Sequence, residues 1–297
     1  MKNFIFLSSI ALSSLLFSCE KDNTESTSPQ TVSLESQQAA TRGYTLIFED
    51  NFNSGSDLNT NWTRTNRADY NSAKCKYKPW KSSIASIDGA SCLRLEATDH
   101  GHEYRSGHVK SKKNFHPRWN EEIHVKSKIK LIAKDGNRFK SFDQTSGAWP
   151  AFWTVQEKDW PKNGEIDIME GYSHGSYDHF ASNMFYGTSV GNNRLGRSAE
   201  REWNNFDSNS RSGWHTYEMF WRNKKGVRSI EVRIDGVTRA SYDNGVNSNL
   251  DLSKFTNHNL IINLNVGSDS GIFSGSTEIF DKTWMFVDYV KVEKKKI

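Results

Sequence analysis

The chain has 297 residues, of which 12% are aromatic and 25% are charged, and its formal net charge is +4. This composition excludes a collagen-like or wholly disordered chain, and the length suffices for one large all-β domain or two smaller ones. The positive charges form no basic stripe interleaved with stacking aromatic residues, so we expect no nucleic-acid partner.

The N-terminus has the pattern of a secretory signal. One lysine precedes an apolar run from Phe4 to Phe17, which is short for a membrane span, and small residues then lead to Cys19. The stretch ending at Cys19 also resembles a bacterial lipobox, in which the cysteine is lipidated after cleavage. We therefore expect residues 1–18 to be a signal peptide and Cys19 to carry a lipid. An ordinary signal peptide with a chance cysteine is the alternative.

Residues 19–43 are expected to form a flexible tether. They are rich in Ser, Thr, Gln and Asn and hold almost no large apolar side chain, so they bury too little surface to offset the entropy of ordering. A lipid followed by a tether predicts an outer-membrane lipoprotein that faces the cell exterior, with a periplasmic location as the alternative. In such an oxidising compartment Cys75 and Cys92 form a disulfide or remain two buried thiols, and the sequence leaves both open.

Residues 44–297 alternate apolar and polar side chains with period two. In the segment EEIHVKSKIKLI, for example, Ile123 begins one face and Lys126 belongs to the other. Asp235-Gly236, between two such runs, is a strong hairpin signal. No stretch of ten or more residues shows a helical stripe. We predict one antiparallel two-sheet sandwich, because both halves of the segment are needed to bury a single core.

The segment NGEIDIMEGY places three acids, Glu165, Asp167 and Glu170, at spacings of two and three. On a helix the three side chains would scatter over different faces. On a regular strand Glu165 and Asp167 share a face, whereas Glu170 has the wrong parity. One extra residue, inserted as a β-bulge around Ile168-Met169, turns Glu170 to the same face. We therefore predict a bulged strand with all three acids on one side.

Two glutamates in this arrangement suit acid and nucleophile chemistry. The bulge brings their carboxyl groups to about 5 Å, near the separation that a retaining glycosidase needs. Like charges raise pKa values, so one glutamate stays protonated while its neighbour is ionised, and Asp167 would hydrogen-bond one of them. A calcium-binding acidic cluster and a plain solvated strand face are the competing interpretations.

The acid strand is one of several ordered segments that share a family pattern. Its Glu-x-Asp-x-x-Glu motif is preceded by the Trp-Pro segments Gly147–Trp153 and Trp160–Gly164. Further matching segments flank these: Phe48–Phe52, Ser106–Ser111, Trp214–Tyr217 with Trp221, Asp235-Gly236, Asn263–Gly267 and Val287–Val290. Together they resemble glycoside hydrolase family 16 over residues 44–293.

The resemblance implies a single catalytic domain, a concanavalin-like β-jelly-roll sandwich with a substrate cleft on its concave sheet. It implies an endo-acting enzyme that cleaves internal β-linkages with retention of configuration. Glu165 would be the nucleophile, Glu170 the general acid and base, and Asp167 the residue that positions Glu165. The chemistry requires no cofactor, and we expect a monomer.

Three tryptophans of the Trp-Pro segments are candidates to line the cleft, where an indole packs on the apolar face of a sugar: Trp149, Trp153 and Trp160. Of the three, Trp153 fits a core position best. Many family members also hold a structural calcium ion. Asp288 is the candidate ligand here, although the matching N-terminal motif has Asp50-Asn51 where an Asp-Glu pair is usual.

One departure from the family pattern bears on the substrate. The family's β-1,3-glucanases carry a Thr-x-His pair on the strand after the catalytic one, and this chain has Asn183 and Phe185 there. We therefore favour chains that contain β-galactosides, such as algal galactans or poly-N-acetyllactosamine of mucin O-glycans, over laminarin-like β-1,3-glucans. Arg118 is a candidate contact for sulfated or sialylated sugars. A non-catalytic glycan-binding lipoprotein is the alternative from another class, followed by a structural or adhesive surface protein.

Overall fold

The computed structural model describes residues 43–68, 73–173, 178–189, 192–195, 202–204, 213–244, 250–267 and 277–297. The predicted signal peptide, the lipidation site Cys19 and nearly all of the predicted tether lie outside these ranges. Within them, no helix is long and apolar enough to cross a membrane.

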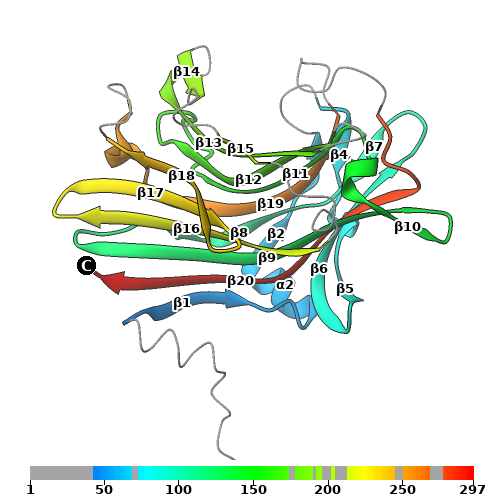
Figure 1. The fold of residues 1–297 in the computed structure, drawn as a ribbon, viewed down its shortest axis with the longest axis horizontal. Helices are drawn as coiled ribbons and strands as arrows, with labels where there is room; N and C mark the ends of the chain where they lie inside the picture. Colours follow the sequence, from blue (N-terminus) through cyan, green and yellow to red (C-terminus); the bar gives the residue numbers. More distant parts are fainter. Residues whose placement is uncertain are drawn as a thin grey trace, which may run out of the picture.

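Two stacked β-sheets make up the described part of the chain, and Figure 1 shows them as an upper and a lower layer. The lower sheet has twelve strands, in the order β18-β17-β16-β9-β20-β6-β7-β4-β3, with β1 beside β20, β10 beside β9 and β5 beside β6. Its strands are β1 (Thr45–Asp50), β3 (Arg67–Ala68), β4 (Cys75–Tyr77), β5 (Ser82–Ile87), β6 (Ala90–Asp99), β7 (Tyr104–Ser106), β9 (Glu121–Asp135), β10 (Arg138–Ser141), β16 (Trp214–Lys224), β17 (Val227–Ile234), β18 (Val237–Asp243) and β20 (Lys282–Lys296).

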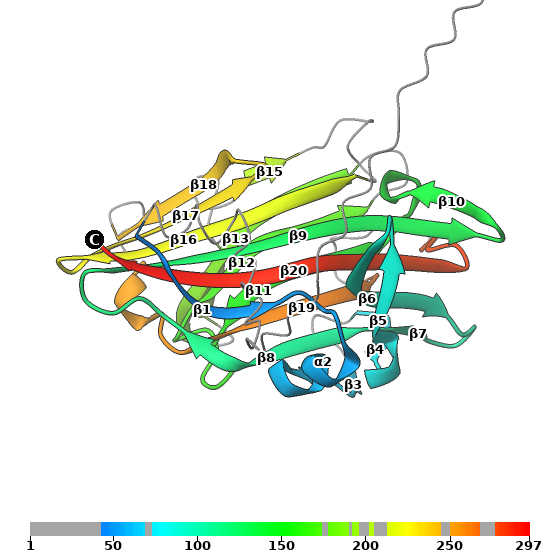
Figure 2. The ribbon, with the colours of Figure 1, turned by 90° about the horizontal axis from the view of Figure 1, so that it is seen from below.

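The upper sheet has eight strands in the order β14-β13-β12-β11-β19-β8-β2, with β15 beside β13. Its strands are β2 (Trp62–Arg64), β8 (His108–Phe115), β11 (Ala148–Val155), β12 (Glu165–Ser173), β13 (Asp178–Ser189), β14 (Asn192–Leu195), β15 (Glu202–Asn204) and β19 (His258–Val266). The described helical segments are short: α2 (Gly55–Asn61) and the 3-10 turns η1 (Pro79–Lys81), η2 (Phe142–Gln144) and η3 (Leu252–Lys254). Figure 2 shows the long strands β9, β16 and β20 side by side, with β11, β12 and β13 in the layer behind them.

The antiparallel sandwich predicted from the period-two pattern is confirmed. In β9, Ile123, Val125 and Ile129 are buried in the core between the sheets. Asp235 and Gly236 form the hairpin turn between β17 and β18, both with positive φ, as this type of turn requires. The short ladder between β4 and β7 is parallel, which the alternation of side chains alone does not predict.

The two cysteines of the folded part are separate buried thiols. Cys75 donates to Oδ1 of Asn265 at 3.2 Å, and Cys92 lies in a second apolar cluster with Ile132 and Trp284. Of the two alternatives left open by the sequence, the structure therefore has the pair of free thiols.

Candidate active site

The predicted β-bulge is present in β12. On β11 the register passes from Met169 opposite Phe152 to Asp167 opposite Trp153, which leaves Ile168 as the inserted residue. On the other side, β13 shows the matching register shift between Asp167 and Glu170. Ile168 and Met169 both point into the core and are fully buried, so the extra residue is accommodated by packing.

The bulge gathers the acids on the outer face of the eight-stranded sheet, directed away from the core. Residues paired across strands share a face. Glu165 pairs with Val155 and Phe185, Asp167 with Trp153 and Asn183, and Glu170 with Ala151 and Ala181. We call this surface the site face. It comprises the outward side chains of β13, β12, β11 and β19: Phe185, Asn183, Glu165, Asp167, Glu170, Tyr172, Trp153, Trp149 and Asn263.

Both glutamates accept hydrogen bonds from neighbouring side chains of the site. The indole Nε1 of Trp160 donates to Oε2 of Glu165 at 2.8 Å. Glu170 accepts from Nε1 of Trp149 at 2.8 Å through Oε1 and from Nδ2 of Asn183 at 2.5 Å through Oε2. Five of the predicted site residues are therefore hydrogen-bonded in two groups, one around each glutamate. Asp167 lies buried between the two glutamates on the same strand.

Electrostatics couples the two glutamates. Burial, and after it the negative charge of Glu170, raises the pKa of Glu165 to about 8, against a smaller lowering by the Trp160 hydrogen bond. Because the two carboxyl groups interact, they titrate as a pair that keeps one proton near neutral pH. A pair that holds one acid and one carboxylate is equipped for proton transfer and nucleophilic attack at the same centre.

Trp160 reaches Glu165 because the loop from residue 156 to 164 is fixed at its end. His258 Nε2 lies 2.7 Å from the backbone oxygen of Asn163. Gly164 then turns the chain into β12 with a φ of +75°, and a Cβ atom at this position would come within 2.3 Å of the ring of Phe255. Glycine is therefore required directly before Glu165.

The remaining aromatic candidates also lie on the site face. The ring of Phe185 packs near that of Trp160, with centroids 6.3 Å apart. Trp153, which the sequence placed in the core, is instead half-buried opposite Asp167 and donates from Nε1 to Oδ1 of Asn263 at 2.6 Å. The core position belongs to its neighbour Phe152, because adjacent strand residues point to opposite faces.

Two site-face residues were missed by the sequence analysis. Tyr172 packs against Trp149, with ring centroids 5.8 Å apart, and Asn263 is buried beside Trp153. The alternation of Asn263 and Asn265 with apolar residues in β19 was the available signal, since it marks an outward polar face.

Arg118 does not join the site through any of its described contacts. It is exposed in the connection between β8 and β9, and its backbone N–H donates to Oε2 of Glu121 at 3.0 Å. The expectation that it contacts the substrate gains no support from this position.

The calcium expectation at Asp288 is not supported either. Asp288 forms an ion pair with Lys128 at 3.0 Å, and no group of three metal-ligating side chains comes together within the described ranges. Asp50, the acid of the N-terminal motif, instead accepts hydrogen bonds from the backbone of Phe52 and from Asn61 and Trp62. These residues do not fit a bound calcium ion.

Known proteins resemble this chain in sequence. The family model described as "XgeA-like, catalytic GH16 domain" matches residues 136–217. The keratan-sulfate endo-1,4-beta-galactosidase of Sphingobacterium multivorum is 31% identical over 239 residues, which cover 74% of this chain and 51% of that protein. The chain thus spans about half the length of that curated relative.

Solved structures agree in fold. A family 16 enzyme from the mixed-linkage glucan locus of Bacteroides ovatus, solved with a product, has a TM-score of 0.64 and 25% identity, with 82% of this chain and 99% of that chain covered. The endo-1,3-beta-glucanase of Streptomyces sioyaensis has a TM-score of 0.66 at 20% identity, with 86% and 98% covered. The sandwich is therefore a β-jelly roll, and the chain belongs to glycoside hydrolase family 16.

Proposed function

We propose that the protein is an endo-acting glycoside hydrolase that cleaves internal β-linkages with retention of configuration. The observation that carries this proposal is the pair Glu165 and Glu170, brought to one face by the bulge, where burial and after it the charge of Glu170 raise the pKa of Glu165. A purely binding protein gains nothing from two repelling carboxyl groups, each fixed by an indole N–H. This argues against the non-catalytic alternative.

In the proposed reaction Glu165 is the nucleophile and Glu170 is the general acid and base. In the reacting state the one proton of the pair lies on Glu170, so a carboxylate oxygen of Glu165 attacks the anomeric carbon while the carboxyl proton of Glu170 passes to the leaving glycosidic oxygen. The resulting glycosyl ester is hydrolysed by water, from which Glu170 takes a proton. The hydrogen bond from Trp160 supports the ionised form of Glu165 in the first step. Asp167, between them, would hold Glu165 in position.

For the substrate we propose chains that contain β-galactosides. The relative that acts on keratan sulfate supports this, as does the Asn183 and Phe185 pair beside the acids. Phe185 offers a flat apolar wall next to Glu165, where the glucanase pattern has a histidine. An endo-β-glucanase is the second candidate, favoured by the likeness to the Bacteroides ovatus enzyme of the mixed-linkage glucan locus.

Digestion of a polymer panel tests both the activity and the substrate. The panel comprises laminarin, mixed-linkage glucan, agarose, porphyran, carrageenan, keratan sulfate and mucin glycans, with products separated by size. We expect a ladder of oligosaccharides from at least one galactose-containing polymer and none from the same polymer with Glu165→Gln. Products from laminarin or mixed-linkage glucan alone would overturn the galactoside assignment. A Glu165→Gln variant that keeps full activity would overturn the hydrolase assignment.

We also propose that Cys19 anchors the enzyme to the outer membrane, facing the cell exterior. β1, the first described strand, pairs with β20 in the twelve-stranded sheet, so the tether would leave from the sheet opposite the site face. This leaves the site face open to an external polymer. Metabolic labelling with a fatty acid should mark the wild type and not Cys19→Ser, and protease shaving of intact cells should release the labelled protein's domain.

A further inference from the structure

Three segments meet at one end of the sandwich: the connection from β8 to β9, the turn between β16 and β17, and residues 294–297. Asn120 joins them, because its Oδ1 accepts from the backbone N–H of Lys225 at 2.8 Å and its backbone oxygen accepts from the N–H of Ile297 at 3.0 Å. Figures 1 and 2 show this end of the long strands beside the label C. We call its exposed residues the end patch: Arg118, Trp119, Lys224, Lys225, Val227 and Lys296.

The end patch exposes two large apolar side chains. Trp119 is 62% exposed and Val227 is 70% exposed. A Cβ atom on Gly226 would lie 3.3 Å from the indole of Trp119, so the ring rests on the turn between β16 and β17 and still faces solvent. In that turn Lys225 and Gly226 both have positive φ, and Lys224 and Val227 pair on either side of it. An indole held outward beside lysines suits the headgroup level of a membrane, where tryptophan is enriched.

The cations of the end patch are not neutralised by acids of the described chain. None of the ion pairs within the described ranges includes Arg118, Lys224, Lys225 or Lys296. The acids that follow the connection are buried and pair with other lysines: Glu121 with Lys294 at 3.5 Å, and Glu122 with Lys295 at 3.1 Å. Residues 116–120, 224–227 and 294–297 contain no acidic residue. The exposed side-chain charge of this end is therefore positive.

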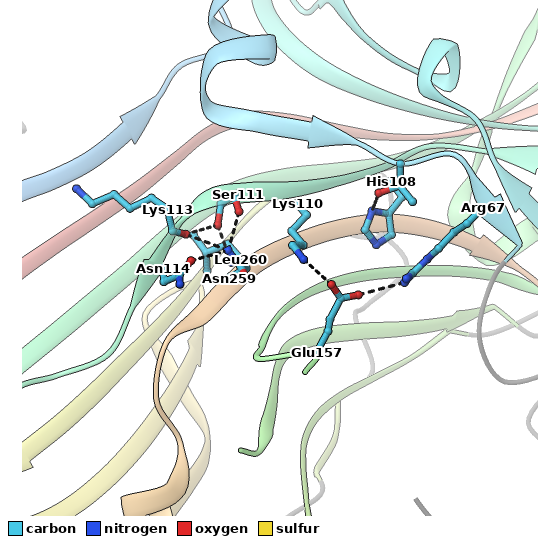
Figure 3. Close-up of polar contacts among 10 residues, drawn as sticks. Arg67, His108, Lys110, Ser111, Lys113, Asn114, Glu157, Asn259 and Leu260 are labelled. Atoms are coloured by element: carbon cyan, nitrogen blue, oxygen red, sulfur yellow. Dashed lines mark hydrogen bonds and ion pairs between the residues drawn. The ribbon is translucent and has the colours of Figure 1, made fainter. Parts of the chain in front are cut away.

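Lysines of β8, the strand that leads into the connection, have partners instead. Figure 3 shows Lys110 directed at Glu157, with which it forms an ion pair at 2.5 Å. Nζ of Lys113 donates to the backbone oxygen of Ile47 at 2.5 Å. The cations of the end patch differ from these in reaching outward from the fold.

The opposite end of the twelve-stranded sheet is mixed in sign. It also exposes an aromatic ring, that of Phe139 on β10. Its lysines and arginine stand among the exposed acids Asp135 and Asp281, and Asp135 pairs with Lys140 at 3.7 Å. An anionic surface is therefore attracted to the end patch more strongly than to this opposite end.

The predicted tether enters the fold beside the end patch. Thr45, the first residue of β1, pairs with Lys294 of β20. As a flexible chain, the tether expected for residues 19–43 spans roughly 25–30 Å, so a lipid at Cys19 would keep the domain close to the bilayer. A surface held so near by a short linker acts at an effective concentration of about a millimolar, at which even a weak lipid contact forms.

We propose that the end patch docks on the anionic lipid headgroups of the membrane to which Cys19 is anchored. Arg118 and the lysines contact the headgroup phosphates, and Trp119 and Val227 enter the headgroup layer. The domain then stands end-on, so the site face, on the broad side of the sandwich, stays open to a polymer. The inference rests on the proposed anchoring and adds a lipid surface as a binding partner of the fold itself.

Vesicle flotation tests the docking without the lipid anchor. The protein is the mature chain from residue 19 onward with Cys19→Ser, and the vesicles are phosphatidylcholine alone or mixed with phosphatidylglycerol. We expect binding to the mixed vesicles only. Each lysine near an anionic surface changes partitioning about fivefold, so Lys224→Gln with Lys225→Gln should weaken binding roughly 25-fold. This effect should shrink as salt is raised, since exposed charges are screened.

Trp119 reports directly on contact with the lipid. Lipids with brominated acyl chains quench indoles that enter the bilayer. The vesicle-bound protein should therefore lose part of its tryptophan fluorescence, whereas vesicle-bound Trp119→Phe should lose none. Quenching that persists in Trp119→Phe would place another surface on the membrane and would overturn the inference.

The matched control makes the same change of charge at the opposite end of the sheet. Lys134→Gln with Arg138→Gln removes two cations there and should leave vesicle binding unchanged. An equal loss of binding in the control would mean that net charge alone drives the association, and would overturn the inference.

Other occupants of the end patch are separate outcomes. Wild-type protein that ignores the mixed vesicles but binds an anionic glycan, or forms dimers, through Lys224 and Lys225 would overturn the lipid assignment. Fatty-acid labelling decides the anchoring independently. A labelled wild type whose Cys19→Ser chain fails to bind vesicles would refute the docking and leave the anchoring intact. An unlabelled wild type would refute the anchoring on which the docking rests.

Discussion

Asn183 and Glu170 lie on adjacent strands, and Nδ2 of Asn183 donates to Oε2 of Glu170 at 2.5 Å. This bond stabilises the ionised form of Glu170, so its loss should raise the pKa of the proposed general acid. We expect Asn183→Ala to shift the alkaline limb of the kcat/KM profile to higher pH and to lower the maximal rate. A profile with unchanged limbs would show that Asn183 does not tune Glu170.

The hydrogen bond from Trp160 to Glu165 can be tested in the same way. Trp160→Phe keeps an aromatic ring beside Phe185 and removes the N–H that Glu165 accepts. Because a hydrogen bond to a charged group contributes about 1.5–3 kcal/mol, we expect kcat/KM to fall roughly tenfold or more. The acidic limb should also move to higher pH, since the carboxylate of Glu165 loses support. Steady-state kinetics across pH measures both, and a drop in rate without a moved limb would speak for lost packing alone.

The raised pKa of Glu165 should also make the stability of the folded protein depend on pH. Burial and the charge of Glu170 raise it to about 8 in the folded protein, above the ordinary value of 4.5. Between these two pH values the unfolded chain releases a proton that the folded protein retains, so rising pH favours unfolding. Glu165→Gln removes this penalty. Urea unfolding should therefore show the variant gaining stability over the wild type as pH rises from 5 to 8, by up to about 1.4 kcal/mol for each pH unit. A difference that is the same at both pH values would contradict the raised pKa.

His124, on β9 of the twelve-stranded sheet, should also make the stability of the protein depend on pH. Burial lowers its pKa, but the hydrogen-bonded Glu218 and Glu293 outweigh burial and leave the pKa raised above 6.5. Its contribution to stability is fully present below 6.5 and is lost as pH rises through the higher folded value. The stability advantage of the wild type over His124→Gln should thus shrink between pH 6 and pH 9 in urea titrations. An advantage that grows over this range would be inconsistent with the ion pairs.

Gly164 allows a test of the turn that delivers Glu165 to the site. Gly164→Ala combines a φ of +75° with a Cβ contact of 2.3 Å to Phe255, so we expect a loss of about 2 kcal/mol or more. Gly136→Ala is the matched control, because its φ is +55° and a Cβ there meets nothing within 4 Å. That control should cost about 1 kcal/mol. Equal losses in denaturant unfolding would mean that Phe255 yields to the added methyl group.

The sequence alone predicts those features that depend only on which face of a strand a residue occupies. The bulge at Ile168 follows from the spacing of the acids alone, because two glutamates five positions apart cannot otherwise share a strand face. The same parity could not place Trp153, since both Phe152 and Trp153 are large and the strand register was unknown. The register of the neighbouring strand decides which of the two faces the core.

Contacts between distant segments were beyond sequence reasoning. Glu157 forms ion pairs with Arg67 and Lys110, which are 90 and 47 positions away in the chain. No local sequence pattern predicts these ion pairs. Asp50 shows the reverse problem. It stands in the N-terminal motif that is associated with calcium in the family, but its carboxylate accepts a hydrogen bond from the indole N–H of Trp62 and so stabilises the fold. The role of such a residue depends on which partners the fold brings to it.

The most direct test of the proposed mechanism is the anomeric configuration of azide adducts, read by NMR with an aryl β-glycoside that has a good leaving group. In Glu165→Ala, azide takes the place of the nucleophile, so we predict the inverted α-glycosyl azide. In Glu170→Ala, azide instead attacks the glycosyl ester on Glu165, so we predict the retained β-glycosyl azide. The opposite pair of configurations would show that the two glutamates exchange roles. Inverted product from the wild type with water would contradict a retaining mechanism altogether.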